Sequence, residues 1–93
     1  MDKYLEKIAI SLKNRAYAIN YSSATEEQKF YALFELRNLM YNLADEFTSN
    51  ISIKEKFFKS CDIQFVFEAY MSKELKGEIR TSTLNKREVL KER

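Results

Sequence analysis

The chain contains no proline and only one glycine among its 93 residues, so the residues that most often interrupt helices are almost missing. Apolar residues instead recur at steps of three and four, which is typical of amphipathic helices. No stretch alternates apolar and polar residues over a useful length. We therefore predict an all-α fold, with a helical domain over residues 1–76 and a charged tail over residues 77–93.

The periodicity predicts three helices, at about residues 3–20, 25–48 and 53–76. Three motifs match the capping box that begins a helix: Ser23-x-x-Glu26, Thr25-x-x-Gln28 and Ser52-x-x-Glu55. We expect Gly77 to end the last helix in a left-handed conformation. The apolar residues that follow are too sparse for a core, and a short fourth helix near residues 84–92 remains an open alternative: Ile79, Leu84, Val89 and Leu90.

The middle helix is apolar on most of its sides. Its central seam is flanked by Ala32 and Leu39 on one side and by Phe30, Tyr41 and Ala44 on the other; the seam itself consists of Leu33, Leu36, Met40, Leu43 and Phe47. Such a helix must be covered on more than one side, so it is central to the fold or to an oligomer. A chain this short buries only about 60–65% of its unfolded surface, and self-association would compensate for a marginal core. We expect a homo-oligomer.

The residues required by several kinds of catalytic and binding site are missing from the chain. The chain has no histidine and a single cysteine, Cys61, which leaves no zinc site, no catalytic dyad and no internal disulfide. One glycine is too few for a phosphate-binding loop. We therefore expect no enzymatic activity, no catalytic residues, no metal and no cofactor, and we expect Cys61 to be buried and inert.

The net charge of +2 is small and lies wholly in the last 17 residues, since residues 1–76 sum to zero. Nucleic-acid binding through this tail is only a third hypothesis, because acidic residues interleave with the basic ones: Arg80, Lys86, Arg87, Lys91 and Arg93. No apolar run approaches the roughly 20 residues that span a membrane, and no signal peptide is recognisable. We expect the protein in the cytoplasm of a bacterium or of a host cell, without a membrane partner.

Four residues are candidates for binding an anionic ligand: Tyr17, Tyr21, Lys29 and Arg37. Tyrosine rings stack on nucleobases, whereas basic side chains and helix N-termini bind phosphates. The first three lie around the predicted turn at residues 20–24, together with Tyr31. The more common alternative is that such tyrosines lie at the edge of the core. For Arg37, the favoured alternative is a structural ion pair with Glu68.

The aromatic residues of the last predicted helix exceed what one face of a single helix can bury. These residues are Phe57, Phe58, Phe65, Phe67 and Tyr70. They indicate either an oligomer or partner surface, since aromatic side chains are enriched at interfaces, or a wide core. The sequence leaves these two alternatives about even.

Residues in three places resemble a family of small phage proteins that sequester cyclic oligonucleotides and so block CBASS immunity. The middle helix carries Glu35-Leu36-Arg37 followed by Leu39 and Leu43, Tyr21 precedes it, and Ala69-Tyr70-Met71 comes later. The family usually has lysine where this chain has Arg37, the spacing from the tyrosine differs by one residue, and the family's tryptophan is absent. The resemblance implies a helical oligomer with nucleotide sites between protomers.

Together these features predict a small non-enzymatic helical protein of phage or bacterial origin. We expect it to oligomerise and to bind a partner protein as an inhibitor or adaptor. Sequestration of an anionic nucleotide, such as a cyclic oligonucleotide, is the alternative.

Overall fold

The computed structural model describes residues 3–79, which form four helices and, within that range, no strand. The helices are α1 (Lys3–Tyr21), α2 (Glu26–Phe47), α3 (Ile51–Cys61) and α4 (Ile63–Leu75). The predicted all-α fold is confirmed. The suggested helix near residues 84–92 and the basic residues of the tail lie outside the described residues.

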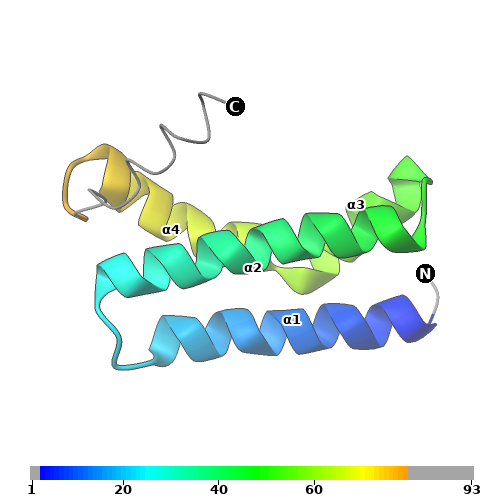
Figure 1. The fold of residues 1–93 in the computed structure, drawn as a ribbon, viewed down its shortest axis with the longest axis horizontal. Helices are drawn as coiled ribbons and strands as arrows, with labels where there is room; N and C mark the ends of the chain where they lie inside the picture. The colour runs from blue at the N-terminus through cyan, green and yellow to red at the C-terminus, as the bar shows by residue number, and fades with distance from the viewer. Residues whose placement is uncertain (1–2, 80–93) are drawn as a thin grey trace.

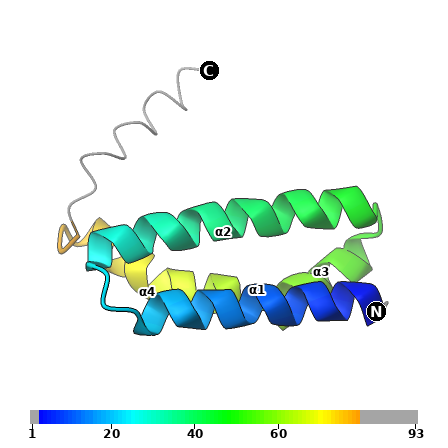
Figure 2. The ribbon, with the colours of Figure 1, turned by 60° about the horizontal axis from the view of Figure 1, so that its bottom comes forward.

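The helices form two layers (Figures 1 and 2). The first layer is an antiparallel pair, α1 and α2, and the second consists of α3 and α4, which together cover one side of that pair. Helix α3 packs chiefly against α1, and α4 packs chiefly against α2. The core lies between the layers. It includes four small or aliphatic positions of α1 at steps of three and four: Leu5, Ala9, Leu12 and Ala16.

The ends of the helices follow local sequence signals. Thr25 begins α2 with the predicted capping box, because its side chain accepts from the Gln28 N–H at 3.1 Å and the Gln28 side chain accepts from the Thr25 N–H at 3.0 Å. The box predicted at Ser52 is wrong. Asn50 instead caps α3 by accepting from the Ile53 N–H at 3.0 Å, which starts the helix earlier.

Gly77 ends α4 as predicted, with φ of +76°. The Gly77 N–H donates to the carbonyl of Glu74 at 3.0 Å, and the Glu78 N–H donates to the carbonyl of Lys73 at 2.8 Å. This is the Schellman arrangement, in which the left-handed residue turns the chain back over the last helical turn. The turn carries Ile79 into the core, where it is buried. The expectation that Ile79 lies beyond the core is therefore wrong.

The structure departs from the predicted helix at 53–76, which is broken in two. Asp62 separates α3 from α4 with φ of 58°, the left-handed conformation that aspartate tolerates better than most residues. Its N–H still donates to the carbonyl of Phe58 at 3.2 Å, and its own carbonyl accepts from the Val66 N–H at 3.3 Å. The chain therefore changes direction at Asp62 with little loss of backbone hydrogen bonds. The change of direction alters which side chains of α3 and α4 point toward the core.

Candidate functional site

The four candidate ligand-binding residues do not form one site. Tyr17 and Tyr21 lie on the side of α1 that faces α4, and their rings stack with centroids 6.2 Å apart. Lys29 lies on the other side of the turn, and Arg37 lies further along α2. Tyr31 is half-buried, and its buried hydroxyl has no hydrogen-bond partner among the described residues.

Tyr17 contacts a carboxylate, which is unfavourable for an anion nearby. Its hydroxyl donates to Asp62 Oδ2 at 2.7 Å. This hydrogen bond, followed by burial and by the negative charge of Asp62, raises the pKa of Tyr17 above its ordinary value. Tyr17 therefore remains a neutral donor at neutral pH, and it ties the end of α1 to the break between α3 and α4.

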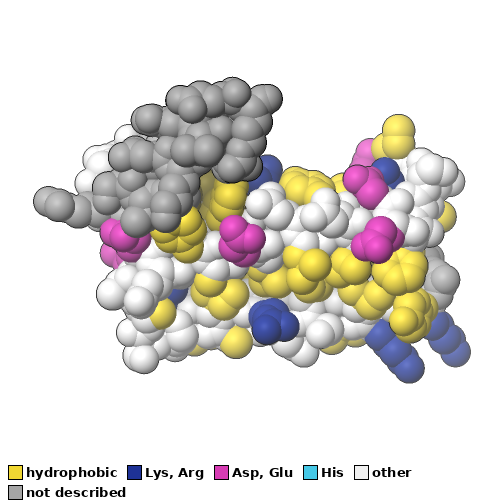
Figure 3. Space-filling model, viewed as in Figure 1, with side chains coloured by type: hydrophobic (Ala, Val, Ile, Leu, Met, Phe, Trp, Pro, Cys, Tyr) yellow, Lys and Arg dark blue, Asp and Glu magenta, His cyan; other side chains and the backbone are white. Residues whose placement is uncertain are grey.

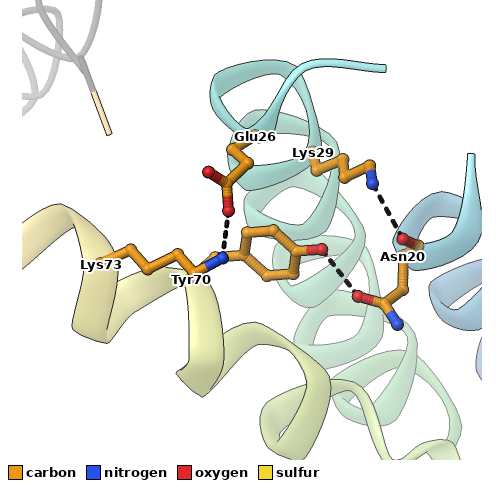
Figure 4. Close-up of polar contacts among 5 residues, drawn as sticks. All are labelled: Asn20, Glu26, Lys29, Tyr70 and Lys73. Atoms are coloured by element: carbon orange, nitrogen blue, oxygen red, sulfur yellow. Dashed lines mark hydrogen bonds and ion pairs between the residues drawn. The ribbon is translucent and has the colours of Figure 1, made fainter. Parts of the chain in front are cut away.

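Lys29 belongs to a polar cluster that joins three helices (Figure 4). Its ammonium donates to the backbone carbonyl of Asn20 at 3.0 Å, while the Asn20 amide oxygen accepts from the Tyr70 hydroxyl at 2.7 Å. Lys73 forms an ion pair with Glu26. The hydrogen bond from Lys73 to Glu26 raises the pKa of Lys73, and burial raises the pKa of Tyr70. The cluster fixes the α1–α2 turn on α4.

Arg37 is held by neighbours other than the one predicted. Its Nε donates to Gln64 Oε1 at 3.0 Å, and its guanidinium lies 5.0 Å from the ring centroid of Tyr41 and 5.7 Å from that of Phe67. The predicted ion pair with Glu68 is not formed; Gln64, one helical turn earlier on α4, contacts Arg37 instead, and Glu68 is exposed beside Tyr21. The cavity beside Arg37 has about 160 Å³, and ligand pockets typically have about 300–1,000 Å³. The contacts of Arg37 thus join α2 to α4, and the cavity beside it is smaller than typical ligand pockets.

The aromatic residues proposed as an interface are mostly core. Phe57, Phe67 and Tyr70 are buried, so for these three the interface alternative is wrong and the wide core is correct. Phe58 is half-buried, and its ring meets Tyr41 edge to face at 5.0 Å. Only Phe65 is exposed, at 71%. The prediction assumed one straight helix with one buried face, whereas the break gives α3 and α4 separate inward faces.

Cys61 is completely buried at the end of α3, as predicted. Burial raises the pKa of its thiol to about 12, so the thiol stays protonated at neutral pH. Protonated, enclosed thiols are poor nucleophiles, and we assign Cys61 to packing.

The side of the α1–α2 pair that faces away from α3 and α4 is covered by no described helix. Figure 3 shows a band of hydrophobic side chains along the line where α1 and α2 meet. Tyr4 and Phe47 meet edge to face at 5.6 Å, and Ile19 and Ala32 line one hollow. Leu39, seven residues after Ala32, is 43% exposed. We call this surface the α1/α2 face; it consists of Tyr4, Ile8, Ile19, Ala32, Leu39, Leu43 and Phe47.

The α1/α2 face has a basic edge and an acidic edge. Lys7 and Arg15 are exposed on α1, and Glu35 and Glu46 are exposed on α2. Figure 3 shows basic side chains on the α1 side of the apolar band and acidic side chains on its α2 side. None of these four side chains forms an ion pair with another residue of the described range. The flank formed by Ala32 and Leu39 was predicted from the sequence, whereas the two charged edges were not. Helical spacing alone could have found Glu35, Leu39 and Glu46 on one stripe.

A hollow of about 560 Å³ opens at the loop end of the α1/α2 face. Two basic residues contribute to its wall, Arg15 from α1 and Lys29 from the first turn of α2. Two polar residues near the turn, Ser22 and Gln28, also line it. The rest of the lining is apolar: Ala18, Ile19, Ala24 and Ala32. Neither candidate tyrosine lines this hollow.

Within residues 3–79, no helix is long and apolar enough to cross a membrane. The same residues hold no group of three or more His, Cys, Asp or Glu side chains placed to bind a metal ion. Comparisons with models of protein families, with curated proteins and with solved structures found no match.

Proposed function

We propose that this chain is a non-enzymatic helical binding protein that acts as a homo-oligomer and presents a partner protein with the assembled surface, as an inhibitor or adaptor. The single observation that carries this proposal is the α1/α2 face. An apolar band of this kind on a small chain is a typical interaction surface, since monomers rarely leave such bands in water.

A second copy of the chain can pair its charged edges with those of this face. Two contacts set the register of the antiparallel pair: Tyr4 beside Phe47, and Asn20 beside Lys29. Because both helices rise about 1.5 Å per residue, Arg15 lies level with Glu35. A twofold axis parallel to the helices would lay α1 of one copy over α2 of the other, with Arg15 opposite the partner's Glu35.

The same axis brings Lys7 within about one helical turn of the partner's Glu46. Each of these contacts would occur twice by symmetry. An axis perpendicular to the helices would instead lay α1 on α1 and set basic side chains against basic side chains. Charge complementarity therefore selects the first arrangement, since like charges across an interface are costly.

The size of the face is adequate for a dimer. Helix α2 has 22 residues, which gives a length of about 33 Å. Two helices packed about 10 Å apart give a width of about 20 Å, and the product is about 660 Å². Stable interfaces bury about 600–1,000 Å² on each partner.

We expect Leu39→Lys to abolish self-association. Sedimentation equilibrium of the wild-type chain over a wide concentration range should show a mass that rises above 11.1 kDa toward a multiple of it. A lysine at this position brings an ammonium into the apolar contact, where assembly would strip it of water, and it would compete with the partner's Arg15 for Glu35, so the affinity should fall at least roughly 100-fold.

The matched control is Leu75→Lys, because Leu75 is 80% exposed but lies on α4, away from the α1/α2 face. This variant should assemble like the wild type. A wild-type chain that stays monomeric, or a Leu39→Lys variant that assembles as well as Leu75→Lys, would refute the proposal.

The hollow beside Lys29 supports a second candidate, binding of an anionic ligand such as a cyclic oligonucleotide. Arg15 and Lys29 supply positive charge at its wall, and Ile19 and Ala32 supply an apolar surface for a base. Its volume of about 560 Å³ lies within the range of small-molecule sites. This candidate site does not include Arg37, Tyr17 or Tyr21, because none of them lines the hollow.

A thermal-shift panel of cyclic di- and trinucleotides tests the second candidate. A ligand at 100 times its Kd stabilises a protein by about 2.7 kcal/mol, which raises Tm by about 10 °C or more in a domain of this size. Lys29→Gln should remove most of that shift, and Lys59→Gln on α3 should leave it intact. No shift across the panel, or a shift that Lys29→Gln leaves unchanged, would eliminate this candidate.

A further inference from the structure

A second hollow, of about 470 Å³, lies on another part of the surface, between the C-terminal half of α1 and α4. Tyr21 and Phe65 line it from opposite helices, and they are 79% and 71% exposed. Side chains this large and this exposed are costly to leave in water when they stand together around one hollow. The interpretation that the tyrosines lie at the edge of the core therefore does not account for Tyr21.

The charge in this hollow is negative. Glu68 contributes an exposed carboxylate to the wall, and no lysine or arginine is among the lining residues. The ring of Tyr17 stacks on Tyr21 at an interplanar angle of 22°. The hydroxyl of Tyr17 donates to Asp62, which increases electron density on the ring face.

We propose that this hollow binds an arginine or lysine side chain on a basic segment of a partner protein. A guanidinium or ammonium placed over the Tyr21 and Phe65 rings is attracted to their negative faces. The carboxylate of Glu68 lies in the same wall and supplies the counter-charge. A planar guanidinium also stacks on aromatic rings, so arginine should bind better than lysine.

The hollow beside Lys29 and the hollow beside Tyr21 thus have opposite preferences for charge. Arg15 and Lys29 surround one, while Glu68 and aromatic rings surround the other. An anionic ligand would be repelled from the hollow beside α4. A second copy placed on the α1/α2 face would leave this hollow open, because Tyr17 and Tyr21 lie on the other side of α1. The partner that binds this hollow is therefore distinct from the second copy of this chain.

The test is a titration of the full chain with acetyl-Gly-Arg-Gly-amide, followed by NMR of the aromatic side chains. We expect saturable shifts confined to Tyr17, Tyr21 and Phe65, with a dissociation constant in the millimolar range. The same peptide with citrulline, the neutral isostere of arginine, should bind at least roughly fivefold more weakly. Equal binding of the two peptides, or no saturable shift, would overturn the proposal.

Two substitutions locate the binding. Glu68→Gln should weaken the arginine peptide roughly fivefold and bring it close to the citrulline peptide, whereas Glu55→Gln on α3 should change nothing. Phe65→Ala should weaken it roughly fivefold by removing one ring. An effect of Glu55→Gln equal to that of Glu68→Gln would overturn the assignment. Leu39→Lys separates the two proposals, because it should bind the peptide normally even as a monomer.

Discussion

Replacing Phe67 by alanine is expected to lower the free energy of unfolding by about 3–5 kcal/mol. Phe67 is only 2% exposed, and its ring contacts Phe30 at 5.2 Å and Phe34 at 6.2 Å between centroids. Truncation would leave a cavity between α2 and α4 and would remove one of the rings that hold Arg37. Domains of this size are stable by about 5–15 kcal/mol, so the loss is a large share of the total.

Phe65→Ala is the matched control, because it makes the same chemical change two residues away. Phe65 is 71% exposed, so we expect a change within about 0.5 kcal/mol. Denaturant unfolding of both variants at one fixed protein concentration checks the pair. In an unbroken helix, Phe65 would share the buried face of Phe57 and Cys61. Equal losses, or a larger loss for Phe65→Ala, would therefore contradict the break at Asp62.

Reversing one charge at the edge of the α1/α2 face is expected to weaken self-association roughly 30-fold. In an Arg15→Glu dimer, two attractive contacts with Glu35 become two repulsive ones, at a cost of about 2 kcal/mol in all. Glu35→Arg should have the same effect. The double variant, which restores both pairs in swapped form, should regain the wild-type affinity within about threefold. Sedimentation equilibrium measures all three.

The control for these reversals is Lys13→Glu. Lys13 is exposed on the opposite flank of α1, two residues from Arg15, and it changes the net charge by the same amount. It should leave the affinity unchanged. In 1 M NaCl the penalties of Arg15→Glu and Glu35→Arg should shrink, because the Debye length falls to about 3 Å. Penalties that persist undiminished in high salt would argue for misfolding rather than lost pairing.

The sequence was sufficient to predict the first two helices. Period 3.6 in the apolar residues and the Thr25 capping box are local signals, and both act within one or two helical turns. The end of α4 at Gly77 is local in the same sense, because a position with left-handed backbone geometry strongly favours glycine. These elements therefore needed no knowledge of packing.

The break at Asp62 could not be predicted in the same way. Neither proline nor glycine stands there, and aspartate is only modestly tolerant of a left-handed conformation. The break is favoured by the burial it allows, because Ile63 and Phe67 face the core while Phe57 and Cys61 remain buried in α3. That gain depends on α1 and α2 already being in place, so it is a property of the tertiary structure.

The candidate site was predicted in part. Sequence spacing placed Tyr17, Tyr21 and Lys29 around one turn, but it could not say that the tyrosines face α4 while Lys29 faces α1. The exposed flank of the middle helix was recognised through Ala32 and Leu39. Helical spacing also puts Glu35 and Glu46 beside Leu39, but that Arg15 lies level with Glu35 follows only from the antiparallel register of α1 and α2.

A mixture of the Arg15→Glu and Glu35→Arg variants tests the proposed assembly most directly. Each variant alone should be largely monomeric at a concentration where the wild type is dimeric, whereas a heterodimer of the two pairs every edge charge with its opposite. Native mass spectrometry of the equimolar mixture should therefore show the heterodimer and little of either homodimer. A mixture that remains monomeric, or one that forms both homodimers as readily as the heterodimer, would contradict the twofold pairing of the α1/α2 face.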